Sequence, residues 1–380
     1  MLFNQIIGQD HLKKQLQTSA QNGRIPHAQL FIGKEGSGTL PMAVAYAQFL
    51  LSHFSDNPEI SALKCEKLQH PDLHFSFPIT TNDVVKSHPT SNSFLEDWRQ
   101  FVATQPYGSL FNWLHHIGVE NKQGLINVEE SEEIVKKLQL KSYEGGFKVM
   151  IIWMAEKMNS SAANKLLKLI EEPPEKTVFI LIVEDEEQLL STIKSRCQAM
   201  YFPDLSEQDI ANSLVVNYQL SENKALNIAH QAEGNYNKAL QLLQNDSSDL
   251  VFEEWFVAWV RTAFRAKGNV AVVQQLIAWS DTISKTGRET QKRFLEYCLQ
   301  FFRQALLFNY KSEQLVFLET KTNFELSKFA PFVHSSNILD IEKEISDAIY
   351  HIERNGNPKI ILLDLSVRLT RFLHKKEPKN

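Results

Sequence analysis

The chain has 380 residues, of which 43% are hydrophobic and 22% are charged, and its formal net charge is −5. This composition excludes a largely disordered protein, and the length is sufficient for two or three domains. The net negative charge gives no global indication of nucleic-acid binding. The odd number of distant cysteines (Cys65, Cys197 and Cys298) favours a reducing cytoplasm over a disulfide framework. The first residues lack the apolar segment of a signal peptide, and no apolar run has the length of a membrane span.

Short apolar runs alternate with amphipathic segments in the first half of the chain. Strands are predicted at residues 30–32, 73–77, 149–154 and 178–183, and helices at 42–51, 128–140 and 159–172. The runs VMIIWM (149–154) and VFILIV (178–183) are apolar throughout, as expected of strands covered on both faces. The alternation predicts an α/β domain with a parallel sheet and flanking helices. The polar residues 80–93 are predicted to form a loop.

After residue 203 the pattern changes. Residues 205–243 predict short helices that are broken at Gly234, and residues beyond 251 predict long helices rich in aromatic residues. We therefore expect an α/β domain at 1–204, a small helical lid at 205–247 and an all-α domain at 248–380. Aromatic residues at helical spacing are more often core or oligomer interface than a base-stacking surface, and we interpret this set in that way: Trp255, Phe256, Trp259, Phe301 and Phe302.

A glycine-rich segment, GKEGSGTL (33–40), lies between a predicted strand and a predicted helix. Gly33, Gly36 and Gly38 suit a loop whose backbone N–H groups wrap phosphates. Such a site also needs a lysine and a hydroxyl, but Thr39 and Leu40 stand at those two positions, and Lys34 lies elsewhere in the loop. For its present chemistry we therefore interpret the loop as a plain glycine turn between strand and helix, although its spacing resembles that of a degenerate ATP site.

The acidic residues that hold Mg²⁺ in such a site would end the strand at 149–154. Trp153 and Met154 occupy these positions, and neither can bind a metal or act as a base. Glu156 follows two residues later, and we expect it to be a solvated carboxylate at a helix start. Two independent losses predict that the chain neither binds Mg-ATP well nor hydrolyses it.

Ser195-Arg196-Cys197 ends the segment LLSTIKSRC (189–197), which is predicted to be helical and precedes a short strand. Arginine at a helix end can stabilise charge on a transferring phosphoryl group, and when it comes from an adjacent subunit it acts in trans. By itself, a single arginine there is more often a capping or salt-bridge residue. Cys197 by itself is interpreted as a small buried apolar residue.

Several segments together resemble bacterial clamp-loader subunits of the delta-prime type, members of the AAA+ superfamily. They are GQDHLKKQL, RIPHAQLFIG, HPDLHFSFP, YEGGFKVMII and AEKMNSSAANKLLKLIEEPPEKTVFILI, followed by QLLSTIKSRCQ, and they cover most of residues 5–202. The NKLLKLIEEPP and SRC combination is the most specific of them. Farther along the chain, only the segment NGNPKIILLDL near Asn355 is similar to the family.

The resemblance implies an AAA+ domain, a helical lid and a helical collar that oligomerises. It implies a hetero-pentamer with gamma/tau-type and delta-type subunits of DNA polymerase III, which places the sliding clamp on primed DNA. It further implies that Arg196, flanked by Ser195 and Cys197, points into the ATP site of the next subunit. Mg-ATP would then be bound by that neighbour, and no cofactor is expected on this chain.

The chain also departs from the family in four ways. It lacks the lysine and the acidic residues described above, and the lid position that carries an arginine in ATP-binding relatives is Asn237. Many relatives carry a four-cysteine zinc module, but this region offers only Cys65 with His70 and His74, so no metal site is expected. The main hypothesis is an ATP-silent subunit that donates Arg196. The alternatives are a weakly ATP-binding ATPase that uses Lys34 and a DNA-binding adaptor.

Overall fold

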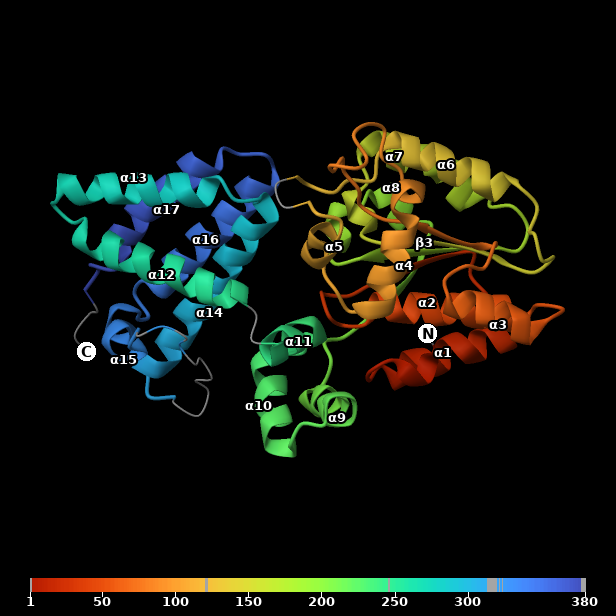
Figure 1. Ribbon diagram of the computed structural model, residues 1–380, viewed down its shortest axis with the longest axis horizontal. Helices are drawn as coiled ribbons and strands as arrows, with labels where there is room; N and C mark the ends of the chain where they lie inside the picture. Colours follow the sequence, from red (N-terminus) through yellow and green to blue (C-terminus); the bar gives the residue numbers. More distant parts are fainter. Residues whose placement is uncertain are drawn as a thin grey trace. The chain divides into compact units, whose positions relative to one another are not determined.

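The computed structural model describes residues 2–119, 122–244, 247–312, 320, 322 and 324–376. The chain divides into two compact units. The first comprises residues 1–119 and 123–243, and the second comprises residues 120–122 and 244–380. Each unit contains apolar clusters of its own, and the two units are described in turn below (Figure 1).

A five-stranded parallel sheet forms the centre of the first unit, in the order β2-β3-β4-β1-β5. The strands are β1 (Ala28–Ile32), β2 (Leu73–Ser76), β3 (Lys148–Ile152), β4 (Thr177–Val183) and β5 (Gln198–Tyr201). Every residue of β1, β3 and β4 is buried, which accounts for their apolar sequences. The predicted parallel α/β sheet is thus confirmed.

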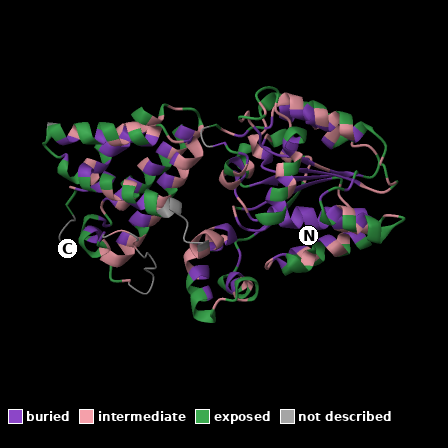
Figure 2. Ribbon diagram, in the orientation of Figure 1, coloured by how far each residue is buried: buried purple, intermediate pink, exposed green. Residues whose placement is uncertain are grey.

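Helices cover both faces of this sheet, as Figure 1 shows for α1, α2 and α3 on one side and α6 and α7 on the other. One face packs on α1 (Asp10–Gln21), α2 (Thr39–His53), α3 (Pro58–Glu66), α4 (Leu95–Thr104) and α5 (Leu110–His116). The other face packs on α6 (Val128–Gln139), α7 (Ser160–Glu171) and α8 (Ser191–Lys194). Alternate residues of a strand serve opposite faces, so that Ile180 joins the first cluster and Leu181 the second. Buried residues therefore run through the central strands of the sheet (Figure 2).

Two predicted elements are shorter in the structure. The strand predicted at 149–154 ends at Ile152, because Met154 adopts a left-handed backbone conformation with φ 54°. The helix predicted at 189–197 begins only at Ser191, because Leu189 and Leu190 are extended. Residues 80–90 form no helix or strand, as predicted, and the short 3₁₀ helix Ser91–Phe94 follows them.

Three short helices complete the first unit: α9 (Glu207–Tyr218), α10 (Glu222–Ala232) and α11 (Tyr236–Gln244). Gly234 separates the last two with a φ of 83°, which confirms the predicted break. Their small core includes Ile210, Leu214 and Ala229, and it also takes in Tyr107, which precedes α5. The small helices therefore pack directly on the α/β part. The domain boundaries at 204 and 247 remain predictions.

The second unit is helical, as predicted. Its elements are α12 (Ser247–Arg265), α13 (Val270–Ser284), α14 (Arg288–Asn309), α15 (Leu326–Phe329), α16 (Ile338–Glu353) and α17 (Pro358–Phe372). Phe256, Trp259, Phe301 and Phe302 are buried in one core, whereas Trp255 is half-buried against it. These aromatic residues are therefore core rather than a base-stacking surface. Among the described residues, none of the helices is both long and apolar enough to cross a bilayer.

Candidate functional site

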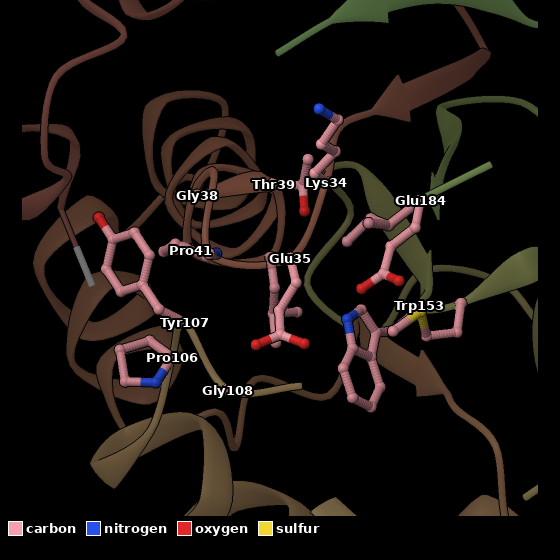
Figure 3. A pocket seen from close by; sticks show the side chains of 14 residues that line it. Lys34, Glu35, Gly38, Thr39, Pro41, Pro106, Tyr107, Gly108, Trp153 and Glu184 are labelled. Carbon is pink, nitrogen blue, oxygen red and sulfur yellow. The ribbon is translucent and has the colours of Figure 1, made fainter. Parts of the chain in front are cut away.

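The first candidate site lies where β1, β3 and β4 end. These strands are neighbours in a parallel sheet, so their carboxyl ends meet at one edge, the usual place for ligands in such folds. A hollow opens there, and Figure 3 shows the side chains that line it. Lining residues come from the glycine loop, from residues 106–108, from Trp153 and Met154 after β3, and from Glu184 after β4.

The glycine loop forms a tight turn. Gly36 and Gly38 have φ values of 74° and 96°, a region that favours glycine, and the N–H of Ser37 donates to the Lys34 carbonyl across 3.1 Å. Gly33 continues from β1, and its N–H donates to the carbonyl of Val183 in β4. The predicted loop is therefore formed between a strand and the N-terminus of α2. Thr39 and Leu40, which replace the lysine and the hydroxyl residue, are both buried.

The charges beside this loop do not suit a polyphosphate. Glu35 and Glu184 both line the hollow, and Lys34 is the only cation among the described residues that line it. The Lys34 side chain is 80% exposed, its Nζ lies 3.5 Å from Asp204 Oδ2, and it points away from Glu35 in Figure 3. Two carboxylates against one outward ammonium disfavour a triphosphate.

An aromatic cluster replaces the acidic end of β3. Trp153 is 3% exposed, and its ring centroid lies 5.1 Å from that of Trp98 and 6.0 Å from that of Phe101. The Trp98 ring in turn stacks on Phe77 at 4.2 Å. This packing leaves no oxygen ligand for a metal at positions 153 and 154, because neither side chain carries one.

Glu156 differs from its prediction as a solvated carboxylate. It lies in a short 3₁₀ helix (Ala155–Lys157), its Oε1 accepts the Glu184 N–H across 3.1 Å, and its Oε2 is buried. Burial raises the pKa of the Glu156 carboxyl group, against the opposing effect of that hydrogen bond. The side chain thus ties the turn after β3 to the end of β4. One of its carboxylate oxygens thus faces inward, and the residue as a whole is half-buried just after the left-handed residue Met154.

The small helices bind the glycine loop directly. Asn237 Nδ2 donates to Glu35 Oε1 across 2.7 Å and contacts Asn112 Oδ1 at 2.8 Å, and Asn235 Nδ2 lies 3.4 Å from the same Glu35 oxygen. The N–H of Tyr236 donates to the Gly36 carbonyl across 3.3 Å. A Cβ on Gly36 would lie 2.0 Å from Asn235 Oδ1, so only glycine allows this approach. Position 237, for which the resemblance implies an arginine in ATP-binding proteins of the family, thus holds the loop through an amide.

A second tie to the loop comes from the start of the chain. Gln9 is buried in a left-handed conformation with φ 58°, and its Nε2 donates to the carbonyls of Ser37 (3.1 Å) and Pro203 (2.7 Å). Nearby, the N–H of Ile7 donates to the Tyr107 hydroxyl across 2.9 Å. The loop is therefore held from two sides by groups of this chain.

The second candidate site is the Ser195-Arg196-Cys197 segment. It follows the single turn of α8, where the N–H groups of Arg196 and Cys197 donate to the carbonyls of Ile193 (3.0 Å) and Lys194 (3.2 Å). Ser195 Oγ donates to the Thr192 carbonyl at 3.2 Å. Cys197 is half-buried against the apolar cluster that includes Ile193, and burial raises the pKa of its thiol to about 12. It therefore acts as an apolar anchor at this position, and its thiol stays protonated.

The Arg196 side chain has two partners inside the chain. Its Nε lies 3.1 Å from Glu171 Oε2, and its Nη1 donates to the Thr192 carbonyl across 2.9 Å. The side chain remains 34% exposed. Arg196 does not line the hollow beside the glycine loop. The two candidate sites are therefore separate.

The histidines and the cysteine considered for a metal have other surroundings. Cys65 is buried in the core, and burial raises the pKa of its thiol to about 12. His70 Nε2 lies 3.0 Å from Glu144 Oε2, and burial lowers the pKa of His74 to about 4. Among the residues that the structure describes, no group of three histidine, cysteine or acidic side chains is arranged to hold a metal ion.

The sequence interpretation missed four residues that define these sites. Glu35 and Glu184 stand inside the glycine loop and directly after β4, where the carboxyl ends of parallel strands meet, and that rule could have selected them. Glu171 and Asn112 carry no such signal, because only the tertiary fold brings them to Arg196 and Asn237.

Comparison with known proteins places these features in a family. The model of the family described as "DNA polymerase III, delta subunit" matches residues 8–206. DNA polymerase III subunit delta' of Bacillus subtilis (strain 168) is 29% identical over 242 residues, which are 63% of this chain and 60% of that protein.

Two further relatives match over shorter shares of their length. DNA polymerase III subunit delta' of Escherichia coli (strain K12) is 33% identical over 128 residues, 34% of this chain and 38% of the relative. DNA polymerase III subunit tau of Bacillus subtilis is 27% identical over 246 residues, 63% of this chain and 37% of the relative. The chain thus matches less than two thirds of the length of each of these relatives.

Proposed function

The chain belongs to the DNA polymerase III delta subunit family of AAA+ clamp-loader subunits, and from this premise we propose that it is a delta-prime-type subunit. In this role it assembles with gamma/tau-type and delta-type subunits in the cytoplasm and takes part in loading the sliding clamp on primed DNA. It binds no ATP itself. It donates Arg196 to the ATP site of a neighbouring subunit, where Mg-ATP is bound.

The carboxylates of Glu35 and Glu184 beside the glycine loop are the main support for the proposal that this chain binds no ATP. Glu35 lies in the loop that would wrap the phosphates, and its carboxylate is bonded to Asn237. A triphosphate would have to displace this bond and approach a second carboxylate, that of Glu184, without a lysine at position 39. The small helices are also joined to the loop by groups of this chain, through Asn237 and Glu35 and through the Tyr236 N–H and the Gly36 carbonyl.

The contacts of Arg196 support the trans role. An arginine has five N–H donors, and the two internal partners use one on Nε and one on Nη1. Within the described residues Nη2 has no hydrogen-bond partner, and the side chain is partly exposed. Donors of this kind can stabilise the negative charge that develops on a transferring phosphoryl group.

Titration of the isolated chain with Mg-ATP in a calorimeter tests the first part. We expect no binding heat at a protein concentration at which a gamma-type subunit in the same buffer titrates with one ATP. Clear one-to-one binding would overturn this part and favour the ATPase alternative with Lys34. The variant Lys34→Ala, whose side chain is largely exposed, would then show whether that residue is responsible.

Replacing Arg196 by alanine in the reconstituted loader tests the second part. With clamp and primed DNA present, we expect the rate of ATP hydrolysis at the neighbouring subunit's site to fall by about tenfold or more. The subunits should still co-elute as one complex in size-exclusion chromatography. Hydrolysis at the wild-type rate would overturn the trans role. Lys176→Ala is the matched control, because this exposed lysine only donates to the Gly145 carbonyl at 3.3 Å.

A further inference from the structure

Glu171 and Arg196 form an ion pair that the proposed function does not yet explain. Glu171 is the last residue of α7, and its Oε2 lies 3.1 Å from Arg196 Nε, on the short turn after α8. The side chains of both residues are partly exposed, at 55% and 34%. An exposed pair of this kind adds little to the stability of a fold, so a stabilising role does not account for it.

Both partners are attached to the same rigid part of the molecule. Ile170 and Ile193, which are fully buried in one apolar cluster under the sheet, stand one residue before Glu171 and three before Arg196. Pro173 and Pro174 follow the last turn of α7 and prevent the helix from continuing. The backbone at Glu171 therefore has a fixed place relative to the backbone at Arg196.

The neighbouring carboxylates form ion pairs with a different cation, Lys194. Glu186 and Glu187 contact the ammonium of Lys194 at 2.8 and 3.1 Å. These two contacts raise the pKa of Lys194 to about 12. Glu186 and Glu187 thus pair with Lys194 at the end of α8, and Glu171 pairs with Arg196, two residues later. The pairing is selective.

We infer that Glu171 is a positioning residue for Arg196, an inference that rests on the trans role proposed above. Glu171 and the Thr192 carbonyl hold one N–H each and fix the side chain, which leaves both N–H groups of Nη2 and one of Nη1 for phosphoryl oxygens. A long arginine side chain loses several rotamers when it is ordered. If Glu171 has already ordered the Arg196 side chain, this conformational entropy is not lost during the reaction. The barrier to the chemical step is then lower.

The test compares Glu171→Ala and Glu171→Gln in the reconstituted loader, with clamp and primed DNA present. We expect Glu171→Ala to lower kcat about three- to tenfold with little change in the KM for ATP, because the residue orients a group and does not bind the nucleotide. Glu171→Gln keeps an oxygen acceptor for Nε and should recover most of the rate. Glu172→Ala is the control, since the Glu172 side chain is exposed and has no hydrogen bond or ion pair among the described residues.

Arg196→Ala and the double variant separate the two ideas. If Glu171 acts through Arg196, Glu171→Ala combined with Arg196→Ala is no slower than Arg196→Ala alone. Three outcomes overturn the positioning role while the trans role stands. The first is a double variant slower than Arg196→Ala, and the second is a wild-type rate in Glu171→Ala. The third is a Glu171→Gln variant slower than Glu171→Ala. A wild-type rate in Arg196→Ala overturns the trans role, and the positioning role with it.

Discussion

Asn237 Nδ2 donates a hydrogen bond to Glu35 Oε1 across 2.7 Å, and this contact joins the first turn of α11 to the glycine loop. The two residues are 202 positions apart in the chain. The contact joins an amide of the small helices to a carboxylate of the glycine loop.

Removing this amide should loosen the small helices. Asn237 is buried, so Asn237→Ala leaves Glu35 with only the longer contact to Asn235 and removes a donor to Asn112. We expect the free energy of unfolding to fall by about 1–3 kcal/mol, and the amides of α11 to exchange hydrogen faster. Urea unfolding and hydrogen exchange would measure both effects. Asn212→Ala on the exposed side of α9 should change neither, and equal behaviour of the two variants would contradict the role assigned to Asn237.

Two glycines with similar backbone conformations should respond differently to alanine. Gly23 has a φ of 68° and open space around its Cα, so Gly23→Ala should cost only the strain of the left-handed conformation, about 1–2 kcal/mol. Gly36 has a φ of 74°, but a Cβ there would lie 2.7 Å from the backbone nitrogen of Tyr236. Gly36→Ala should therefore lose about 1–3 kcal/mol more. Chemical unfolding of both variants compares them, and equal losses would show that the loop and the lid are not in close contact in solution.

His74 should make the first unit sensitive to mild acid. Burial and the positive charges of Lys137 and Lys148 lower its pKa from 6.5 to about 4, against the opposing effect of Asp72. Between these two pH values the unfolded chain binds a proton that the folded chain does not, so stability falls as the pH drops from 6.5 towards 4. The loss should reach about 2–3 kcal/mol.

The variant His74→Gln cannot take up this proton. Its free energy of unfolding should therefore fall less than that of the wild type over the same pH range, as measured by urea unfolding at several pH values. Parallel pH profiles for the two proteins would rule out His74 as the source of the acid sensitivity.

In the helical unit, Lys292 should matter more than an ordinary surface lysine. Its side chain is 15% exposed, and its Nζ lies 2.6 Å from Glu353 and 3.5 Å from Glu289. Burial lowers the pKa of Lys292, but the carboxylates outweigh burial and raise it overall. Lys292→Met removes the cation that faces these acids and should cost about 2–4 kcal/mol.

A second lysine provides the comparison for Lys292. Lys285→Met interrupts an ion pair with Asp281 in which the lysine is 73% exposed, and it should cost less than about 1 kcal/mol. Thermal unfolding would compare the variants, and adding Glu353→Gln to Lys292→Met should recover part of the loss. If both lysine variants melt alike, the pairing of Lys292 contributes no more than a surface contact does.

The sequence predicted the central strands well because β4, and the part of β3 that continues into Trp153, are apolar without interruption, which only strands covered on both faces tolerate. The glycine loop was also predictable, since its spacing between strand and helix is a local property. The aromatic cluster around Trp153 is not predictable in this way, because Trp98 and Phe101 come from α4, a segment without a clear pattern of its own in the sequence analysis. Nor is the inward-facing carboxylate oxygen of Glu156, just after the left-handed residue Met154.

Gln9 has a consequence beyond its two hydrogen bonds to the carbonyls of Ser37 and Pro203. Its amide connects the glycine loop to the point where the chain leaves β5 for α9, a connection built into the polypeptide rather than supplied by a small molecule. We expect the conformation of this unit to be the same whether the cell is rich in ATP or depleted of it. Any response of an assembly to the concentration of ATP in the cell would then have to originate in its other subunits, because the conformation of this chain would not change with it.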